Sequence, residues 1–123
     1  MVDQSRPSVI EDAYMVTMIN LHIVNPEQRD RAMWLLKTNT ELARKAKGFI
    51  SREILFSTSD PLKGYSIAKW ETREDMEAFL KSPGRPALTT EGPEKRVYEN
   101  TPSGKVLLFT STNPDVFELV EVP

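Results

Sequence analysis

The stretch Gly64–Pro83, GYSIAKWETREDMEAFLKSP, decides the predicted fold because a strand in it runs directly into a capped helix. Residues 65 to 70 alternate in the way typical of a strand, whose successive side chains point to opposite faces. One face of this strand carries Ser66, Ala68 and Trp70. Trp70 is its last residue, so the ring is predicted to lie where the chain turns back over the sheet, either as core packing or as a pocket wall.

The helix that follows has recognisable start and stop signals. Thr72 stands at the N-cap position, and Asp75 three residues later forms a variant of the capping box. Pro83 comes directly after the helical pattern and ends it. The apolar residues between these signals recur at helical spacing and are Met76, Phe79 and Leu80.

A strand and a long helix precede this unit. Met15–Val24 is predicted to be a strand with apolar residues on both faces, so both faces are expected to be covered. The Asn-Pro pair after it ends the strand. Glu27–Lys47 is predicted to be the longest helix, and Gly48 is placed to end it. Trp34 falls on the outer side of this helix, where the N-terminal arm or another subunit would cover it, or where it lies partly exposed on neighbouring side chains.

The remaining elements follow from alternation and turn residues. Phe49–Ser57 is predicted to be the second strand and to form a hairpin with the strand of the opening stretch. Ser82–Ser103 is predicted to be a long ordered loop, with a short helical turn near Ala87–Thr90. Val106–Thr110 and Val116–Val122 are predicted to be two further strands, separated by an Asn-Pro-Asp turn.

The predicted order of elements is therefore β–α–β–β–α–loop–β, with one more strand at the end. This order indicates an α+β fold of the ferredoxin-like, split βαβ kind, with an antiparallel sheet and both helices on one face. Because the other face needs a cover, a homodimer is expected. Residues 1–13 are predicted to be an N-terminal arm, docked through Val9, Ile10 and Tyr14 or disordered, and residues 14–123 a single domain.

Composition excludes several classes of partner. The chain has 123 residues and a net charge of −2 without a basic run, so nucleic acid is not expected to bind. No apolar stretch is long enough to span a membrane, and no signal peptide is recognisable. The absence of cysteine excludes disulfides and thiolate chemistry and fits a cytoplasmic protein.

Residues 15–83 resemble the antibiotic biosynthesis monooxygenase domain, a family of dimeric α+β barrels. The resemblance is carried by the first strand with its long helix, by Lys47-Gly48-Phe49 at the start of the second strand, and by Ala68-Lys69-Trp70-Glu71-Thr72 at the end of the third. It is also carried by the acidic helix that stops at Ser82-Pro83. The Trp-Glu-Thr junction is the most specific of these features.

The resemblance implies a pocket between sheet and helices, in which a phenolic polycycle reacts with dioxygen and no cofactor is needed. An ionised phenol or enol can itself reduce dioxygen, and the protein supplies an apolar cavity and a hydrogen bond or base. Trp70 stands at the position of the family's pocket tryptophan. Some members carry an asparagine four residues earlier, where this chain has Ser66. Haem-degrading relatives use a histidine after the second helix, whereas this chain has none between Glu71 and Pro123.

These arguments select the candidate site residues. The catalytic candidates are Trp70, Ser66 and His22, and the substrate-binding candidates are Asn39, Leu21, Ala68, Phe79 and Tyr98. His22, the only histidine, titrates near neutrality when unperturbed and could act as a general base, or it could be a hydrogen-bonded residue inside the dimer interface. If Leu21 faces the helices, Asn20 points away from the pocket.

Three functions remain open from the sequence. The first is a cofactor-independent monooxygenase acting on an aromatic, polyketide-like substrate. The second is a relative that binds or degrades haem, with His22 as its only histidine ligand. The third is a non-catalytic module that binds a small ligand on the same barrel. In each case no metal other than haem iron, no nucleic acid and no membrane is expected as a partner.

Overall fold

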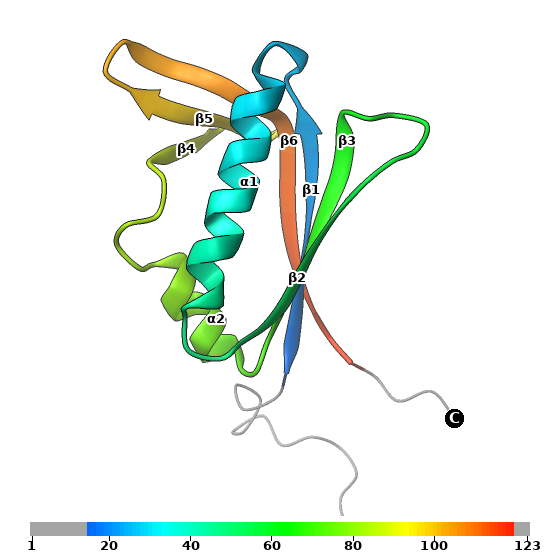
Figure 1. Ribbon diagram of the computed structural model, residues 1–123, viewed down its shortest axis with the longest axis vertical. Helices are drawn as coiled ribbons and strands as arrows, with labels where there is room; N and C mark the ends of the chain where they lie inside the picture. Colours follow the sequence, from blue (N-terminus) through cyan, green and yellow to red (C-terminus); the bar gives the residue numbers. More distant parts are fainter. Residues whose placement is uncertain (1–14, 120–123) are drawn as a thin grey trace, which may run out of the picture.

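The computed structural model describes residues 15–119, which form a curved antiparallel sheet with both helices on one side (Figure 1). Within these residues the strand order is β2-β3-β1-β6-β5-β4. The elements are β1 (Val16–Val24), the short 3-10 helix η2 (Pro26–Gln28), α1 (Arg29–Arg44), β2 (Phe49–Phe56), β3 (Lys63–Trp70), α2 (Arg73–Leu80), β4 (Leu88–Glu91), β5 (Arg96–Thr101) and β6 (Gly104–Glu118). The expected ferredoxin-like α+β fold is confirmed.

The inner face of the sheet is set by the pairing of β1 with β3. In this register Val16 lies opposite Trp70, and Asn20 lies opposite Ser66. The alternation predicted for β3 is confirmed, because Ser66, Ala68 and Trp70 are all buried while Tyr65 is exposed. Val16 and Trp70 belong to a core cluster that also contains residues of both helices.

The face of β1 that the helices cover is the opposite of the one considered in the sequence. Val16, His22 and Val24 are buried under the helices, so the even-numbered residues point inward. Leu21 is consequently on the outer face, opposite Tyr65 of β3. Alternation shows which residues share a face, but because both faces of this strand are apolar it does not show which face is covered.

The helices begin and end at local signals. The side chain of Asn25 accepts a hydrogen bond from the amide of Glu27 at 3.3 Å, which starts η2 and delays α1 to Arg29. The hydroxyl of Thr72 accepts from the amide of Asp75 at 3.0 Å, so the predicted N-cap of α2 is confirmed.

The end of α1 differs from the prediction, because the helix stops at Arg44 and a turn leads to Gly48. Gly48 has φ +81°, and a Cβ atom there would come within 2.2 Å of the carboxylate of Asp75. Glycine therefore satisfies both the backbone conformation and the close approach of α2 to this turn.

The segment predicted to be a loop is a hairpin in the structure. β4 and β5 pair antiparallel where the sequence indicated an irregular stretch and a helical turn near Ala87–Thr90. The prolines of this segment favoured the prediction of a loop, but they lie in the connections between strands: Pro86 precedes β4, Pro93 is in the hairpin turn and Pro102 is in the turn to β6.

The two predicted C-terminal strands are one continuous strand, β6. Its residues up to Phe109 pair with β5, whereas Pro114 lies opposite Asn20 of β1 beyond that pairing. The strand has one open side at Pro114, so the missing amide costs no ladder hydrogen bond there. The part of the predicted strand from Val120 to Val122 lies outside the described residues, as does the predicted N-terminal arm.

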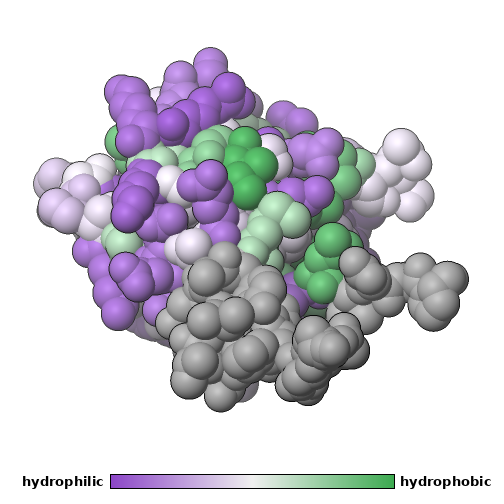
Figure 2. Space-filling view, turned by 90° about the horizontal axis from the view of Figure 1, so that it is seen from below, coloured by the Kyte–Doolittle hydropathy of each residue, from purple (hydrophilic) through white to green (hydrophobic). Residues whose placement is uncertain are grey.

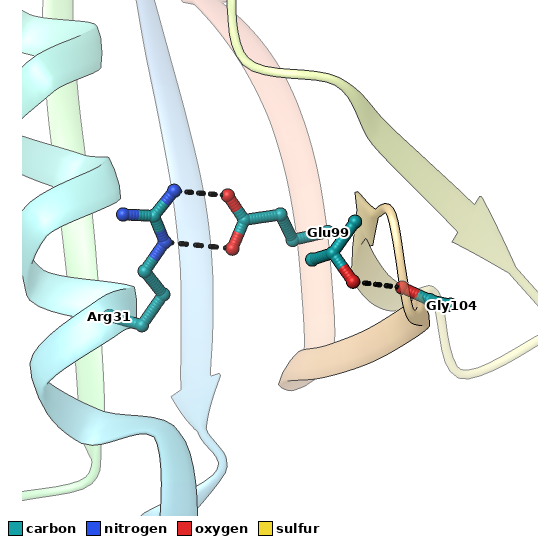
Figure 3. Close-up of polar contacts among 4 residues, drawn as sticks. Arg31, Glu99 and Gly104 are labelled. Atoms are coloured by element: carbon teal, nitrogen blue, oxygen red, sulfur yellow. Dashed lines mark hydrogen bonds and ion pairs between the residues drawn. The ribbon is translucent and has the colours of Figure 1, made fainter.

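An ion pair connects the β4–β5 hairpin to α1. The guanidinium group of Arg31 donates to both carboxylate oxygens of Glu99 on β5, with 2.8 Å between Arg31 Nε and Glu99 Oε1 (Figure 3). At the end of β5, the hydroxyl of Thr101 donates to the carbonyl oxygen of Gly104 at 2.6 Å. The Arg31–Glu99 ion pair holds the hairpin beside the helix, where it closes one side of the space under the sheet.

The outer face of the sheet carries large apolar side chains that the helices leave uncovered. Leu21, Tyr65 and Leu55 lie side by side across three strands, and Tyr65 and Leu55 are 41% and 52% exposed. Seen from the end of the sheet, apolar side chains reach the surface among hydrophilic ones (Figure 2). Trp34 on α1 is also exposed, with the Arg31 guanidinium 3.8 Å from its ring centre. Among residues 15–119, no helix is long and apolar enough to cross a membrane.

Candidate active site

Two adjoining cavities lie between the sheet, α1 and the segment after α2. The first, which we call the His22 cavity, has a volume of about 140 Å³ and also borders on Leu35, Val97 and Phe109. The second, the Trp70 cavity, has a volume of about 160 Å³ and also borders on Met18, Ala68 and Phe79. Both cavities are lined by the same four polar residues, which therefore stand between them: Asn20, Asn39, Arg52 and Arg85.

Aromatic rings form the wall of the Trp70 cavity. Trp70 is only 1% exposed, and its ring contacts Phe49 edge-to-face at 5.4 Å and Phe79 at 5.3 Å. Phe79 comes from the apolar face of α2, and Ala68 on β3 adds little bulk. A flat apolar ligand suits such a wall because aromatic rings bury large areas and stack.

His22 lies on the inner face of β1, not in a subunit interface as one interpretation held. Its Nε2 atom is 2.9 Å from the hydroxyl oxygen of Ser66, and its ring lies 5.1 Å from that of Phe109. Burial, and then the positive charge of Arg52, lower the pKa of His22 from 6.5 to about 4. The imidazole is consequently neutral at physiological pH and a weak base.

The side chain of Ser66 is hydrogen-bonded to His22. Its side chain is 2% exposed, and it borders neither cavity. Ser66 is therefore placed to orient His22 rather than to contact a ligand.

Arg52 is the first site residue that sequence reasoning missed. It lies on the inner face of β2, opposite Ala68, because the register of β2 shifts between Phe49 and Ser51. Its Nη1 atom donates to the hydroxyl of Thr40 at 3.0 Å. Burial, and then the charge of Arg85, lower the pKa of Arg52 to about 10. The signal in the sequence was a charged residue in alternation with Ile54 and Phe56.

Arg85 is the second site residue that sequence reasoning missed, and it lies in the segment after α2. Its Nε atom donates to Asn39 Oδ1 at 3.2 Å, and its Nη1 atom donates to the carbonyl oxygen of Leu80 at 2.9 Å. The guanidinium carbon lies 5.0 Å from the ring centre of Phe79, and burial lowers the pKa of Arg85. Asn39, one of the predicted substrate-binding residues, borders both cavities.

The remaining predicted residues divide into two groups. Trp70, Ala68, Phe79, Asn39 and His22 surround the two cavities. Leu21 and Tyr98 do not: Leu21 faces outward, and the neighbour Val97 takes the inner position on β5. The ring of Tyr98 instead lies 5.2 Å from Nζ of Lys105. Asn20, expected to point away, borders both cavities.

The site contains polar atoms and charges that residues 15–119 leave without partners. Asn20 Oδ1, His22 Nδ1, Trp70 Nε1 and Thr112 Oγ1 are buried and have no hydrogen-bond partner among residues 15–119. Over the same residues, neither Arg52 nor Arg85 forms an ion pair with a carboxylate. Buried polar groups normally have partners, so this concentration around two cavities is typical of a ligand site.

The described residues do not fit a histidine-ligated haem. His22 Nε2 is occupied by Ser66, its ring is 3% exposed, and Arg52 places a positive charge nearby. No group of three or more metal-ligating side chains occurs in the part of the chain that the structure describes.

A sheet carrying two helices on one face, with an aromatic-walled cavity between the layers, defines an α+β domain. The model of the antibiotic biosynthesis monooxygenase family matches residues 15–87, so the chain belongs to that family. No curated protein matches the chain.

Solved structures share the fold at low sequence identity. SnoaB, a cofactor-independent oxygenase from Streptomyces nogalater, has 14% identity and a TM-score of 0.64 over 89% of this chain and 97% of its own. A conserved protein from Methanosarcina mazei has 15% identity and a TM-score of 0.63 over 89% and 97%. Rv0793 from Mycobacterium tuberculosis has 15% identity and a TM-score of 0.63 over 88% and 97%.

Proposed function

We propose that this protein is a cofactor-independent monooxygenase that oxidises a phenolic or enolic aromatic compound with dioxygen. The observation that carries the proposal is the Trp70 cavity, which places an aromatic wall beside two arginines that no carboxylate neutralises in the described part of the chain. Family membership and the fold shared with SnoaB, a cofactor-independent oxygenase, support the same reaction class.

The chemistry requires that the substrate lose a proton, which passes to solvent water, before it meets dioxygen. The resulting enolate or phenolate donates an electron to dioxygen, and the radical pair then forms a carbon–oxygen bond. Protonation gives a hydroperoxide on a carbon that still carries hydrogen, and loss of water from it leaves a ketone. One dioxygen molecule is thus consumed, with one oxygen atom in the product and one in water.

Arg52 and Arg85 support the first step electrostatically. Positive charges held in a site of low polarity stabilise an oxyanion more strongly than water-exposed charges do. The two arginines favour ionisation of the substrate more than His22 does. A base whose conjugate acid has a pKa of about 4 is a poor acceptor for the proton of a phenol, whose pKa is about 10. In this proposal Trp70 and Phe79 hold the ring.

Two further positions have roles in the proposal. Asn39 fixes Arg85 through their 3.2 Å hydrogen bond. The Ser66–His22 pair shapes the neighbouring cavity and, through His22 Nδ1, offers a polar atom to the ligand.

The test is oxygen uptake by the purified, metal-free protein in the presence of an anthrone. Turnover well above the rate of spontaneous oxidation is expected, with quinone formed in a one-to-one ratio to dioxygen. The variant Trp70→Leu should lose most of this rate, whereas Trp34→Leu, at the exposed tryptophan of α1, should keep it. Absence of turnover across a panel of anthrones and naphthols contradicts the proposal.

A non-catalytic ligand-binding module is a second candidate, favoured by one observation. The only histidine has a depressed pKa and a hydrogen bond to Ser66, so no strong general base lies in the described site. This candidate predicts that phenols bind in the cavity, detected by quenching of tryptophan fluorescence, without oxygen uptake.

We also propose that a second copy of the chain covers the outer face of the sheet. The outer-face row of Leu21, Tyr65 and Leu55, of which Tyr65 and Leu55 are exposed, supports this homodimer. Leu55→Glu is expected to yield a monomer in analytical ultracentrifugation, whereas Lys37→Glu, on the exposed side of α1, is expected to leave the dimer intact. A wild-type chain that sediments as a monomer contradicts the proposal. The cytoplasmic location expected from the absence of cysteine remains a prediction.

A further inference from the structure

The two arginines of the site have unused hydrogen-bond donors in a specific arrangement. Arg52 uses only Nη1, for Thr40 and, at 3.5 Å, for the carbonyl oxygen of Leu36. Its Nε and Nη2 atoms therefore have no partner among residues 15–119. Nε and Nη2 form the edge of a guanidinium group that binds both oxygens of a carboxylate through two parallel hydrogen bonds.

Arg85 complements this edge. It uses Nε for Asn39 and Nη1 for Leu80, which leaves Nη2 without a partner in the described chain. Both arginines border both cavities, and their charges interact closely enough for one to destabilise the other. Two like charges without a counter-ion are costly, and a bound anion relieves that cost.

The surroundings of the two arginines favour an anion attached to an aromatic ring. On one side the Trp70 cavity offers the rings of Trp70 and Phe79, while neither cavity is lined by an aspartate or glutamate. A ligand with its ring against Trp70 would place a substituent toward the partition between the cavities.

We propose that Arg52 and Arg85 form a carboxylate-binding subsite between the two cavities, so that the ligand of this pocket is an aromatic carboxylic acid. The inference rests on the proposed function, since it names the substrate class for the same pocket. Arg52 presents two adjacent donors, which match the two oxygens of a carboxylate better than a single phenolate oxygen, while the charge of Arg85 acts both on this carboxylate and on the oxyanion that forms beside it.

The experiment measures binding alone, by titration calorimetry with naphthoate, naphthamide and naphthol at neutral pH. Naphthoate and naphthamide differ in charge but hardly in shape, and naphthol presents a single oxygen. We expect naphthoate to bind at least about tenfold more tightly than either of the others, the usual margin of a charge-assisted hydrogen bond. Equal affinities for all three overturn the proposal.

Variants assign the preference to the two arginines. Arg52→Met and Arg85→Met should each reduce the affinity for naphthoate about tenfold or more while changing that for naphthamide little. Arg29→Met removes an exposed charge from the start of α1 and should change neither. Arg52→Lys should restore only part of the affinity, because lysine keeps the charge but loses the fork. Equal loss for naphthoate and naphthamide in the folded variants, judged by circular dichroism, overturns the proposal.

The binding experiment and the oxygen assay can succeed or fail independently of each other. Selective binding of naphthoate by a protein that oxidises no anthrone contradicts the proposed function and leaves the carboxylate subsite standing. Oxidation of uncharged anthrones without any preference for their carboxylated derivatives contradicts the subsite and leaves the proposed function standing.

Discussion

Replacing Arg52 by methionine is expected to stabilise the free protein, which distinguishes a ligand-binding arginine from a structural one. Arg52 is partly buried, has no carboxylate partner in the described chain and lies near a second positive charge, Arg85. Methionine fills a similar volume and removes the unneutralised charge. In a structural role the same change would destabilise the fold.

The expected magnitude follows from the pKa of Arg52. A pKa lowered to about 10 corresponds to a cost of about 3 kcal/mol for holding the charge in the folded state. Remaining contact with solvent reduces this to about 2 kcal/mol. Loss of the hydrogen bond to Thr40 reduces the expected gain in stability by about 1 kcal/mol. Thr40 keeps its own bond to the carbonyl oxygen of Leu36 at 2.8 Å, so no hydroxyl is left without a partner.

The assay is chemical and thermal unfolding of the variant without ligand. A net gain of about 1 kcal/mol should raise the midpoint temperature by about 4 °C for a chain of this size. Ile54→Met, at the next inward position of β2, is the matched control and should lower stability by less than about 1.5 kcal/mol. A loss of stability in Arg52→Met larger than in this control would refute the reasoning.

Three further changes test other parts of the structure. Burial lowers the pKa of His22 to about 4, so below about pH 6.5 the unfolded chain binds a proton that the folded chain does not. The free energy of unfolding should therefore fall by about 2 kcal/mol between neutrality and pH 5. His22→Gln should remove that part of the pH dependence in urea unfolding. Gly48→Ala should destabilise by about 1–3 kcal/mol, since its Cβ would lie 2.2 Å from the carboxylate of Asp75 at a φ of +81°, and unchanged thermal stability would contradict this. Glu99→Gln breaks the ion pair with Arg31, so the amides of the β4–β5 hairpin should exchange hydrogen faster while those of β1 keep their rate. Equal exchange rates of the hairpin amides in the wild type and the variant would show that the ion pair does not hold the hairpin.

The parts of the fold that were predictable are those with local signals. The unit of β3 and α2 was predicted because alternation, an N-cap threonine and a terminating proline all lie within one short stretch. The β4–β5 hairpin was not, because LTTE and RVYENT contain few apolar residues and are surrounded by prolines. The continuity of β6 through Pro114 depends on where its pairing with β5 ends, which is a property of the whole sheet.

The candidate site was predictable only on its apolar side. Trp70, Ala68 and Phe79 were found because they lie on one strand face and one helix face of the same unit. The charged side combines Arg52, whose inward direction follows a shift of register in β2, with Arg85 from a loop. The sequence contains no local pattern that brings these two residues together, so their proximity could be seen only in the structure.

Isotopically labelled dioxygen shows directly whether this protein oxidises an aromatic substrate. Metal-free protein is incubated with a carboxylated anthrone under the labelled gas, beside an identical sample without protein, and the product is weighed by mass spectrometry. The proposed reaction predicts that the new ketone oxygen carries the label and that Trp70→Leu and Arg52→Met each slow its formation. An unlabelled product, or a rate no higher than without protein, would contradict the account.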